Sequence, residues 1–135
     1  MSRENSGIAL QLIEASNRRD VDAFLALVSP DVEWEDPVFW SEVSQTYRGR
    51  AEVRAWFNRV VEPWESLHFE VEEITETPDD RVFLETLLTT RGKGSGAETQ
   101  IRLWYVVWIA NGKITRRQVF RGRDEALEAA GLRDG

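Results

Sequence analysis

The second half of the chain is a series of strand patterns separated by short turn signals, and this feature constrains the fold most strongly. Apolar and polar residues alternate at 67–71, which is typical of a strand with one buried face. Apolar strand patterns follow at 82–90, 99–109 and 114–121. Because strands joined by short connections pair in antiparallel fashion, we expect a meander of four long strands.

The connections between these strands carry specific turn chemistry. Thr-Pro-Asp-Asp at 77–80 is a turn signal, and the glycine-rich stretch 92–96 indicates a flexible link. Asn-Gly at 111–112 is the strongest short-range hairpin signal in the chain. The alternation changes phase at Ile74, so we predict a bulge at 72–73, which would curve the sheet.

Helical patterns precede and follow these strands. An amphipathic helix is predicted over 8–16, and a second, shorter helix begins after Asp20 and ends at Pro30. The clearest helical pattern is 53–61, where apolar residues recur at i, i+3, i+4, i+7 and i+8. A short helix over 125–130 closes the chain. Helices grouped ahead of antiparallel strands predict an α+β domain whose sheet wraps around helices.

A short strand before the third helix places one acid on an apolar face. Successive side chains of a strand point to opposite faces, so Asp36 shares a face with Val32 and Trp34, whereas the two intervening glutamates point to the other. Pro37 lacks an N–H and biases the residue before it to an extended conformation. The strand is therefore predicted to end with the Asp36 carboxylate, our candidate site acid.

The order of elements and several short stretches resemble the nuclear transport factor two-like superfamily, in its SnoaL-like and ketosteroid isomerase-like branch. The stretches that carry the resemblance are 19–22, 32–38, 47–50, 111–114 and 125–132. The resemblance covers the whole chain and implies a single domain over residues 1–135. Its fold would be an α+β, cone-shaped roll in which N-terminal helices pack in a curved, mostly antiparallel sheet.

The resemblance also implies a role for Asp36, which matches the general base of ketosteroid isomerases. Those enzymes need two hydrogen-bond donors for the developing enolate oxygen, and the matching positions here hold Leu12 and Trp104. Losing such donors costs roughly 10²–10³ in rate each, so we expect no efficient steroid isomerisation. The Arg-Asp-Asp set of the related epoxide hydrolases falls on Thr86, Leu88 and Val119, which weakens that alternative.

The concave face of the sheet is predicted to line a pocket for a small, largely apolar ligand. We assign the even-numbered residues of 102–108 to this face, and we expect the aromatic loop at 38–47 to cover the mouth. The predicted lining residues are Trp34, Phe39, Trp40, Trp56, Leu84, Leu88, Arg102, Trp104, Trp108, Arg117 and Val119. In the alternative, the tryptophans simply fill a core and the protein is a non-catalytic binding or dimerisation module.

Two interpretations of Asp36 stay open on the sequence alone. In an apolar cavity its carboxyl group would suit proton transfer, as in isomerisation or cyclisation next to a carbonyl. A facing arginine, Arg102 or Arg117, would instead form a structural ion pair with it. The single histidine, His68, alternates with glutamates and is assigned to the polar face.

The remaining partners follow from composition and from the odd-numbered face of 103–109. A net charge of −7 without a basic run argues against nucleic acid, and no segment approaches the ~20 apolar residues of a membrane span. With no cysteine and one histidine, we expect no metal, no cofactor and a cytoplasmic location. Leu103, Tyr105, Val107 and Ile109 form an apolar row that is predicted to be a homodimer interface.

Overall fold

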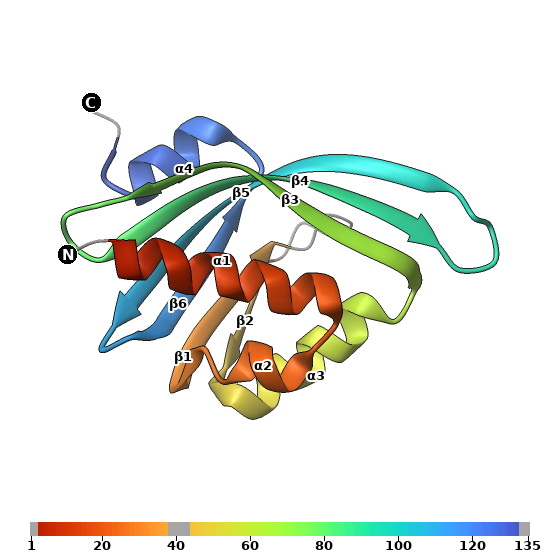
Figure 1. Cartoon of the computed structure of the whole chain (residues 1–135), viewed down its shortest axis with the longest axis horizontal. Coiled ribbons are helices and arrows are strands. Elements are labelled where there is room, and N and C mark those ends of the chain that lie inside the picture. The colour runs from red at the N-terminus through yellow and green to blue at the C-terminus, as the bar shows by residue number, and fades with distance from the viewer. Residues whose placement is uncertain (1–2, 38–43, 133–135) are drawn as a thin grey trace.

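The computed structural model describes residues 3–37 and 44–132 (Figure 1). The described elements are α1 (Arg3–Arg18), α2 (Val21–Leu25), β1 (Val28–Pro37), β2 (Ser44–Arg48), α3 (Gly49–Val61), β3 (Trp64–Glu76), β4 (Arg81–Gly92), β5 (Glu98–Ala110), β6 (Lys113–Phe120) and α4 (Arg123–Ala129). None of these helices has the length and hydrophobicity that a membrane span requires.

The described strands form a single curved sheet in the order β2-β1-β6-β5-β4-β3. Its pairs are antiparallel except for β1 and β6, which run parallel. Helices α1, α2 and α3 lie on the concave side of the sheet, and the short α4 lies on the convex side (Figure 1). The predicted α+β cone, with helices packed in a mostly antiparallel sheet, is confirmed.

The turn chemistry that the sequence predicted is present. Asn111 and Gly112 both have positive φ angles, 52° and 76°, as a two-residue hairpin between twisted strands requires. In the turn before β4, the Arg81 backbone N–H donates to the Thr77 hydroxyl over 3.0 Å. The register of β3 on β4 shifts between Val71 and Glu73, which confirms the predicted bulge.

The first half of the chain departs from the sequence prediction at two places. Asp20 caps α2 as expected, but the helix ends at Leu25 and Pro30 lies inside β1. The register of β1 on β6 shifts between Val28 and Glu33. Pro30, which has no backbone N–H, therefore interrupts no regular series of hydrogen bonds between these strands. Ser44–Arg48, expected as part of a loop, pairs with β1 as an edge strand, whereas residues 38–43 lie outside the described part.

The predicted facing of β5 is wrong by one residue. Its odd-numbered residues point to the concave side, and Leu103, Tyr105, Val107 and Ile109 are buried in the main core. The predicted homodimer interface is therefore wrong, because these side chains are buried within the chain itself. The homodimer remains a prediction, but these residues cannot form its interface. Arg102, Trp104 and Trp108 belong to the convex face, opposite to their predicted place in the pocket.

A bulge in β6 explains this reversal. A regular ladder after the Asn111-Gly112 turn would pair Trp104 with Val119, which would put the two side chains on one face. In the structure the register shifts between Trp108 and Ile109, and Tyr105 pairs with Val119 instead. The residue without a partner is Thr115, whose hydroxyl donates to the Trp108 carbonyl over 3.3 Å. One extra residue thus exchanges the two faces of β5.

Both faces of β5 are covered, so its hydrophobic pattern does not distinguish them. On the convex side, Phe83 and Val106 pack with Ala126 and Ala130 of the C-terminal segment that contains α4. Trp104 lies against this cluster, and its indole N–H donates to a Glu85 carboxylate oxygen over 2.9 Å. A strand buried on both sides is apolar at odd and even positions alike.

We predict that Val107→Asp strongly destabilises the protein, because Val107 is 1% exposed and the new carboxylate would be buried in the core. The expected loss in the free energy of unfolding is more than about 3 kcal/mol in urea denaturation. Ile101→Asp is the matched control on the same strand, since Ile101 is 43% exposed; its expected cost is about 1 kcal/mol or less. A Val107→Asp variant as stable as the control would contradict the observed facing.

Candidate functional site

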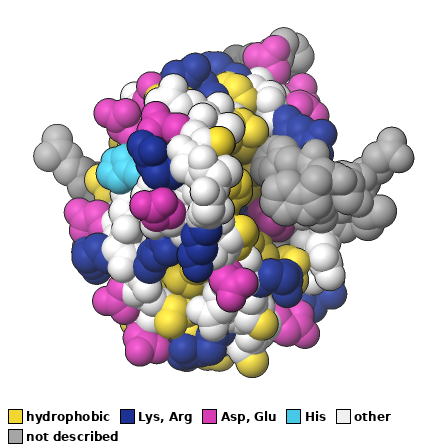
Figure 2. All heavy atoms as spheres, turned by 90° about the vertical axis from the view of Figure 1, so that its right-hand side faces the viewer, with side chains coloured by type: hydrophobic (Ala, Val, Ile, Leu, Met, Phe, Trp, Pro, Cys, Tyr) yellow, Lys and Arg dark blue, Asp and Glu magenta, His cyan; other side chains and the backbone are white. Residues whose placement is uncertain are grey.

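The concave side of the sheet encloses a cavity of about 450 Å³. Every described element except β2 and α4 contributes to its wall, and most contributing side chains are aliphatic or aromatic. The exposed Ile101 also lines it, so the cavity reaches the surface near the tips of β4 and β5. Figure 2 shows a seam of hydrophobic side chains at this end of the molecule, between polar and charged ones.

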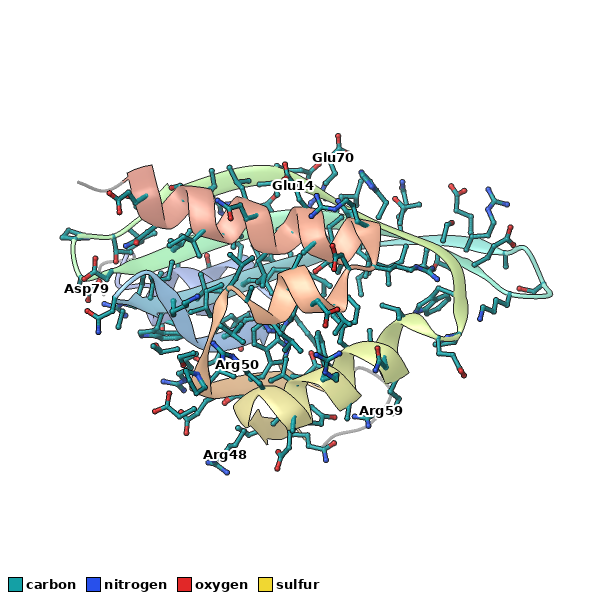
Figure 3. The ribbon with its side chains drawn as sticks, turned by 60° about the horizontal axis from the view of Figure 1, so that its bottom comes forward. Glu14, Arg48, Arg50, Arg59, Glu70 and Asp79 are labelled. Atoms are coloured by element: carbon teal, nitrogen blue, oxygen red, sulfur yellow. The ribbon has the colours of Figure 1, made fainter. Side chains whose placement is uncertain are left out.

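A buried ion pair lies in the wall of this cavity. Arg117 Nη2 donates to Asp36 Oδ1 over 3.1 Å, and the two side chains are 5% and 19% exposed, respectively. Asp36 Oδ2 accepts a second hydrogen bond, also of 3.1 Å, from the indole N–H of Trp56. By contrast, the acidic side chains of Glu14 and Glu70 point outward from the molecule (Figure 3).

Local structure explains why these residues meet. Asp36 and Trp34 share a face of β1, and Trp34 pairs directly with Arg117 across the parallel β1/β6 ladder. Trp56 reaches the pair from α3, whose other apolar residues anchor the helix on the sheet. Three elements distant in sequence, β1, α3 and β6, thus meet at the Asp36 carboxylate.

Three aromatic rings surround the Arg117 guanidinium, and we call them the aromatic box. Its Cζ atom lies 4.3 Å from the ring centroid of Trp34, 5.1 Å from that of Trp56 and 5.4 Å from that of Tyr105. A cation held over aromatic faces away from water gains about 2 kcal/mol or more per favourable contact. The box therefore offsets part of the cost of burying this charge.

Tyr105 adds a hydroxyl group to the same wall. Burial raises the pKa of this phenol above its ordinary value, and the nearby Asp36 carboxylate acts in the same direction. The Arg117 guanidinium and a hydrogen bond with Thr86 act in the opposite direction, but burial dominates. The hydroxyl consequently keeps its proton at neutral pH and can donate a hydrogen bond.

Two donors in this region have no partner within the described part of the protein. They are the Nε atom of Arg117 and the indole nitrogen of Trp34, and both are fully buried. An unpaired buried donor costs roughly 1–3 kcal/mol. Of the five N–H groups of Arg117, one donates a hydrogen bond to Asp36.

A comparison with protein-family models decides the family. The model of the SnoaL-like domain matches residues 9–117 of this chain. The chain belongs to the SnoaL-like family. A search of curated protein sequences found no match.

Solved structures agree with this SnoaL-like fold. An NTF2-like protein of unknown function from Burkholderia pseudomallei has a TM-score of 0.77 at 22% identity, covering 96% of this chain and 98% of its own. SalBIII, an epoxide hydrolase/cyclase-like enzyme of pyran ring formation in salinomycin, has a TM-score of 0.77 at 22% identity, covering 90% and 93%. A hypothetical protein from Catenulispora acidiphila with a ketosteroid isomerase-like fold, in complex with trimethylamine, has a TM-score of 0.75 at 19% identity, covering 93% of both chains. At these identities the likeness concerns the fold alone.

The structure brings together most of the residues singled out from the sequence of this SnoaL-like protein. Those in the cavity wall are Trp34, Asp36, Trp56, Leu84, Leu88, Arg117 and Val119. Arg102, Trp104 and Trp108 are displaced to the convex face by the β6 bulge, and Phe39 and Trp40 lie outside the described residues. Of the two arginines considered for Asp36, it is Arg117 that pairs with it, so the ion pair that was the alternative to an unpaired base is present. Arg102 instead binds Glu72 over 2.7 Å.

Sequence reasoning missed Tyr105, which it had assigned to the homodimer interface. Its place in the cavity wall follows from its pairing with Val119, which depends on the bulge at Thr115 and has no clear signal in the sequence. His68 is exposed and does not line the cavity. Within the described residues, no group of three or more His, Cys, Asp or Glu side chains is placed to hold a metal ion.

We predict that Tyr105 makes stability fall with rising pH above the ordinary tyrosine range of about 10. The folded state retains the phenolic proton that the unfolded state loses, because burial raises the pKa of Tyr105. Since the folded state then binds more protons, the free energy of unfolding falls by up to about 1.4 kcal/mol per pH unit. Urea denaturation at pH values on both sides of 10 measures this slope, and Tyr105→Phe should reduce it. An unchanged slope in the variant would contradict the buried phenol.

Proposed function

We propose that this SnoaL-like protein binds a small, largely apolar ligand in the concave cavity, with Asp36 and Arg117 at the polar part of its wall. The observation that carries the proposal is an apolar cavity of about 450 Å³ that reaches the surface and contains one buried ion pair. Pockets for small molecules are typically ~300–1,000 Å³ and apolar, with a few polar groups that orient the ligand. The trimethylamine complex and the SalBIII enzyme, which share the fold, support a small-molecule role.

The charge of the protein supports the same class of ligand. A net charge of −7 without a basic run disfavours polyanions such as nucleic acid. The acidic surface also does not extend into the cavity, where the Asp36 carboxylate is balanced by Arg117. A largely apolar cavity whose two charges balance receives apolar molecules by removing their surface from water.

As a second step of this proposal, Asp36 acts as a general base next to a ligand carbonyl, for isomerisation or cyclisation. The supporting observation is that its carboxylate lines the cavity and remains 19% exposed despite its two hydrogen bonds. A carboxylate accepts about four hydrogen bonds, so both oxygens retain lone pairs. Leu12 offers no donor and Trp104 lies outside the cavity, but Arg117 is a donor beside Asp36 that would serve a developing enolate oxygen.

The epoxide hydrolase alternative receives no support from the site. The positions that would carry its Arg-Asp-Asp set hold Thr86, Leu88 and Val119, none of which carries a charge. The alternative of a non-catalytic binding module differs from the proposal only in the chemical step, because it would use the same cavity.

Filling the cavity should abolish binding. We predict that benzylacetone, a small aromatic ketone, quenches or shifts tryptophan fluorescence saturably in the wild type, since Trp34 and Trp56 line the cavity. Leu88→Trp should weaken this binding at least about tenfold by occupying the space. The matched control is Leu87→Trp, because Leu87 is the neighbouring residue on the convex face and should leave affinity unchanged. Equal affinity in both variants would place the ligand elsewhere.

The general-base step has a separate test. Exchange of benzylacetone protons next to the carbonyl, followed by NMR in deuterated water, should be faster with the wild type than with Asp36→Asn by roughly 10²–10⁴. Binding measured in parallel separates loss of the base from loss of the site. Equal exchange rates would remove Asp36 from catalysis, and wild-type binding without exchange would favour the non-catalytic module.

A further inference from the structure

We propose that Arg117 determines the charge specificity of the cavity: it occupies the aromatic box as an internal cation and restricts the ligand to uncharged molecules that bear an oxygen acceptor. This inference rests on the proposed ligand-binding function and deepens it. It concerns which chemical class enters the site, and not whether the site is used.

The cation position in the aromatic box is already filled. The ring centroids of Trp34, Trp56 and Tyr105 lie 4.3–5.4 Å from the Arg117 guanidinium carbon. Proteins usually recognise organic cations with aromatic ring faces arranged in this way. Arg117 is buried and bonded to Asp36, so an organic cation would have to displace a tethered group. It would also meet a like charge at close range.

The cavity wall is also unfavourable for anions. The only carboxylate in the wall of the described cavity is Asp36, and its charge is neutralised by Arg117. A ligand carboxylate would lie beside Asp36 and compete for the same guanidinium. Removing its charge from water would then be poorly compensated.

The polar part of the wall has hydrogen-bond donors for a neutral ligand. One of the five N–H groups of Arg117 binds Asp36. Its Nε is fully buried, so the Nη groups are the donors that can meet a ligand in the cavity. A neutral ligand oxygen, such as that of a ketone or amide, satisfies such donors without bringing a charge into the apolar cavity.

Three probes with one skeleton test this proposal: benzylacetone is neutral, phenylpropanoate is anionic and phenethyltrimethylammonium is cationic. We expect the wild type, measured by calorimetry and tryptophan fluorescence, to bind the ketone at least about tenfold more tightly than either charged probe. Equal affinity for ketone and ammonium in the wild type would overturn the proposal.

Variants of Arg117 assign the effect to this residue. Arg117→Met keeps an apolar side chain between the rings, frees the Asp36 carboxylate and should raise the affinity for the ammonium probe at least about tenfold. Because an unpaired buried carboxylate strongly destabilises a protein, the variant Asp36→Asn/Arg117→Met provides a second measurement. Its ratio of ketone to ammonium affinity should also fall below the wild-type ratio. Arg116→Met is the control, since Arg116 lies over Trp108 on the convex face and should leave the ratio unchanged.

The outcomes separate this inference from the proposed function. A wild-type ratio retained in the folded variants that lack Arg117 would overturn the role of Arg117 and leave the ligand site standing. Failure of all three probes to bind the wild type would overturn the ligand site, and the inference with it.

Discussion

The buried ion pair of Asp36 with Arg117 is the interaction on which the rest of the site depends. It joins the end of β1 to β6, receives Trp56 from α3, and lies under the faces of Trp34 and Tyr105. Neither charge is tolerable there alone, because an isolated ion in an apolar interior costs several kcal/mol. The ion pair therefore needs three features at once: the aromatic faces, the parallel pairing of β1 with β6, and the position of α3.

The same interaction gives the cavity its chemical character. The pair supplies the charged side chains in the described wall of a largely apolar cavity, beside a protonated phenol. The SnoaL-like fold does not fix a reaction, since one fold hosts many activities. In this chain the Arg117 guanidinium itself lies against the faces of Trp34, Trp56 and Tyr105.

Much of the fold was predictable from local patterns, because turns and helix periods are local properties. The Asn111-Gly112 hairpin, the bulge at 72–73 and the facing of Asp36 followed from residue chemistry and from a period of two. The facing of β5 did not, because α4 covers its outer side and both faces are apolar. Thr115 decides the register, and a single bulged residue leaves no clear signal in the sequence.

The central claim is that the ligand lies in the concave cavity with its polar group at Arg117. A crystal structure of the protein with benzylacetone tests it most directly. We expect the ketone oxygen within hydrogen-bond distance, about 3 Å, of Arg117, and the phenyl ring toward Leu88. A ligand bound on the convex face, or in the cavity with its oxygen away from Arg117, would contradict the claim.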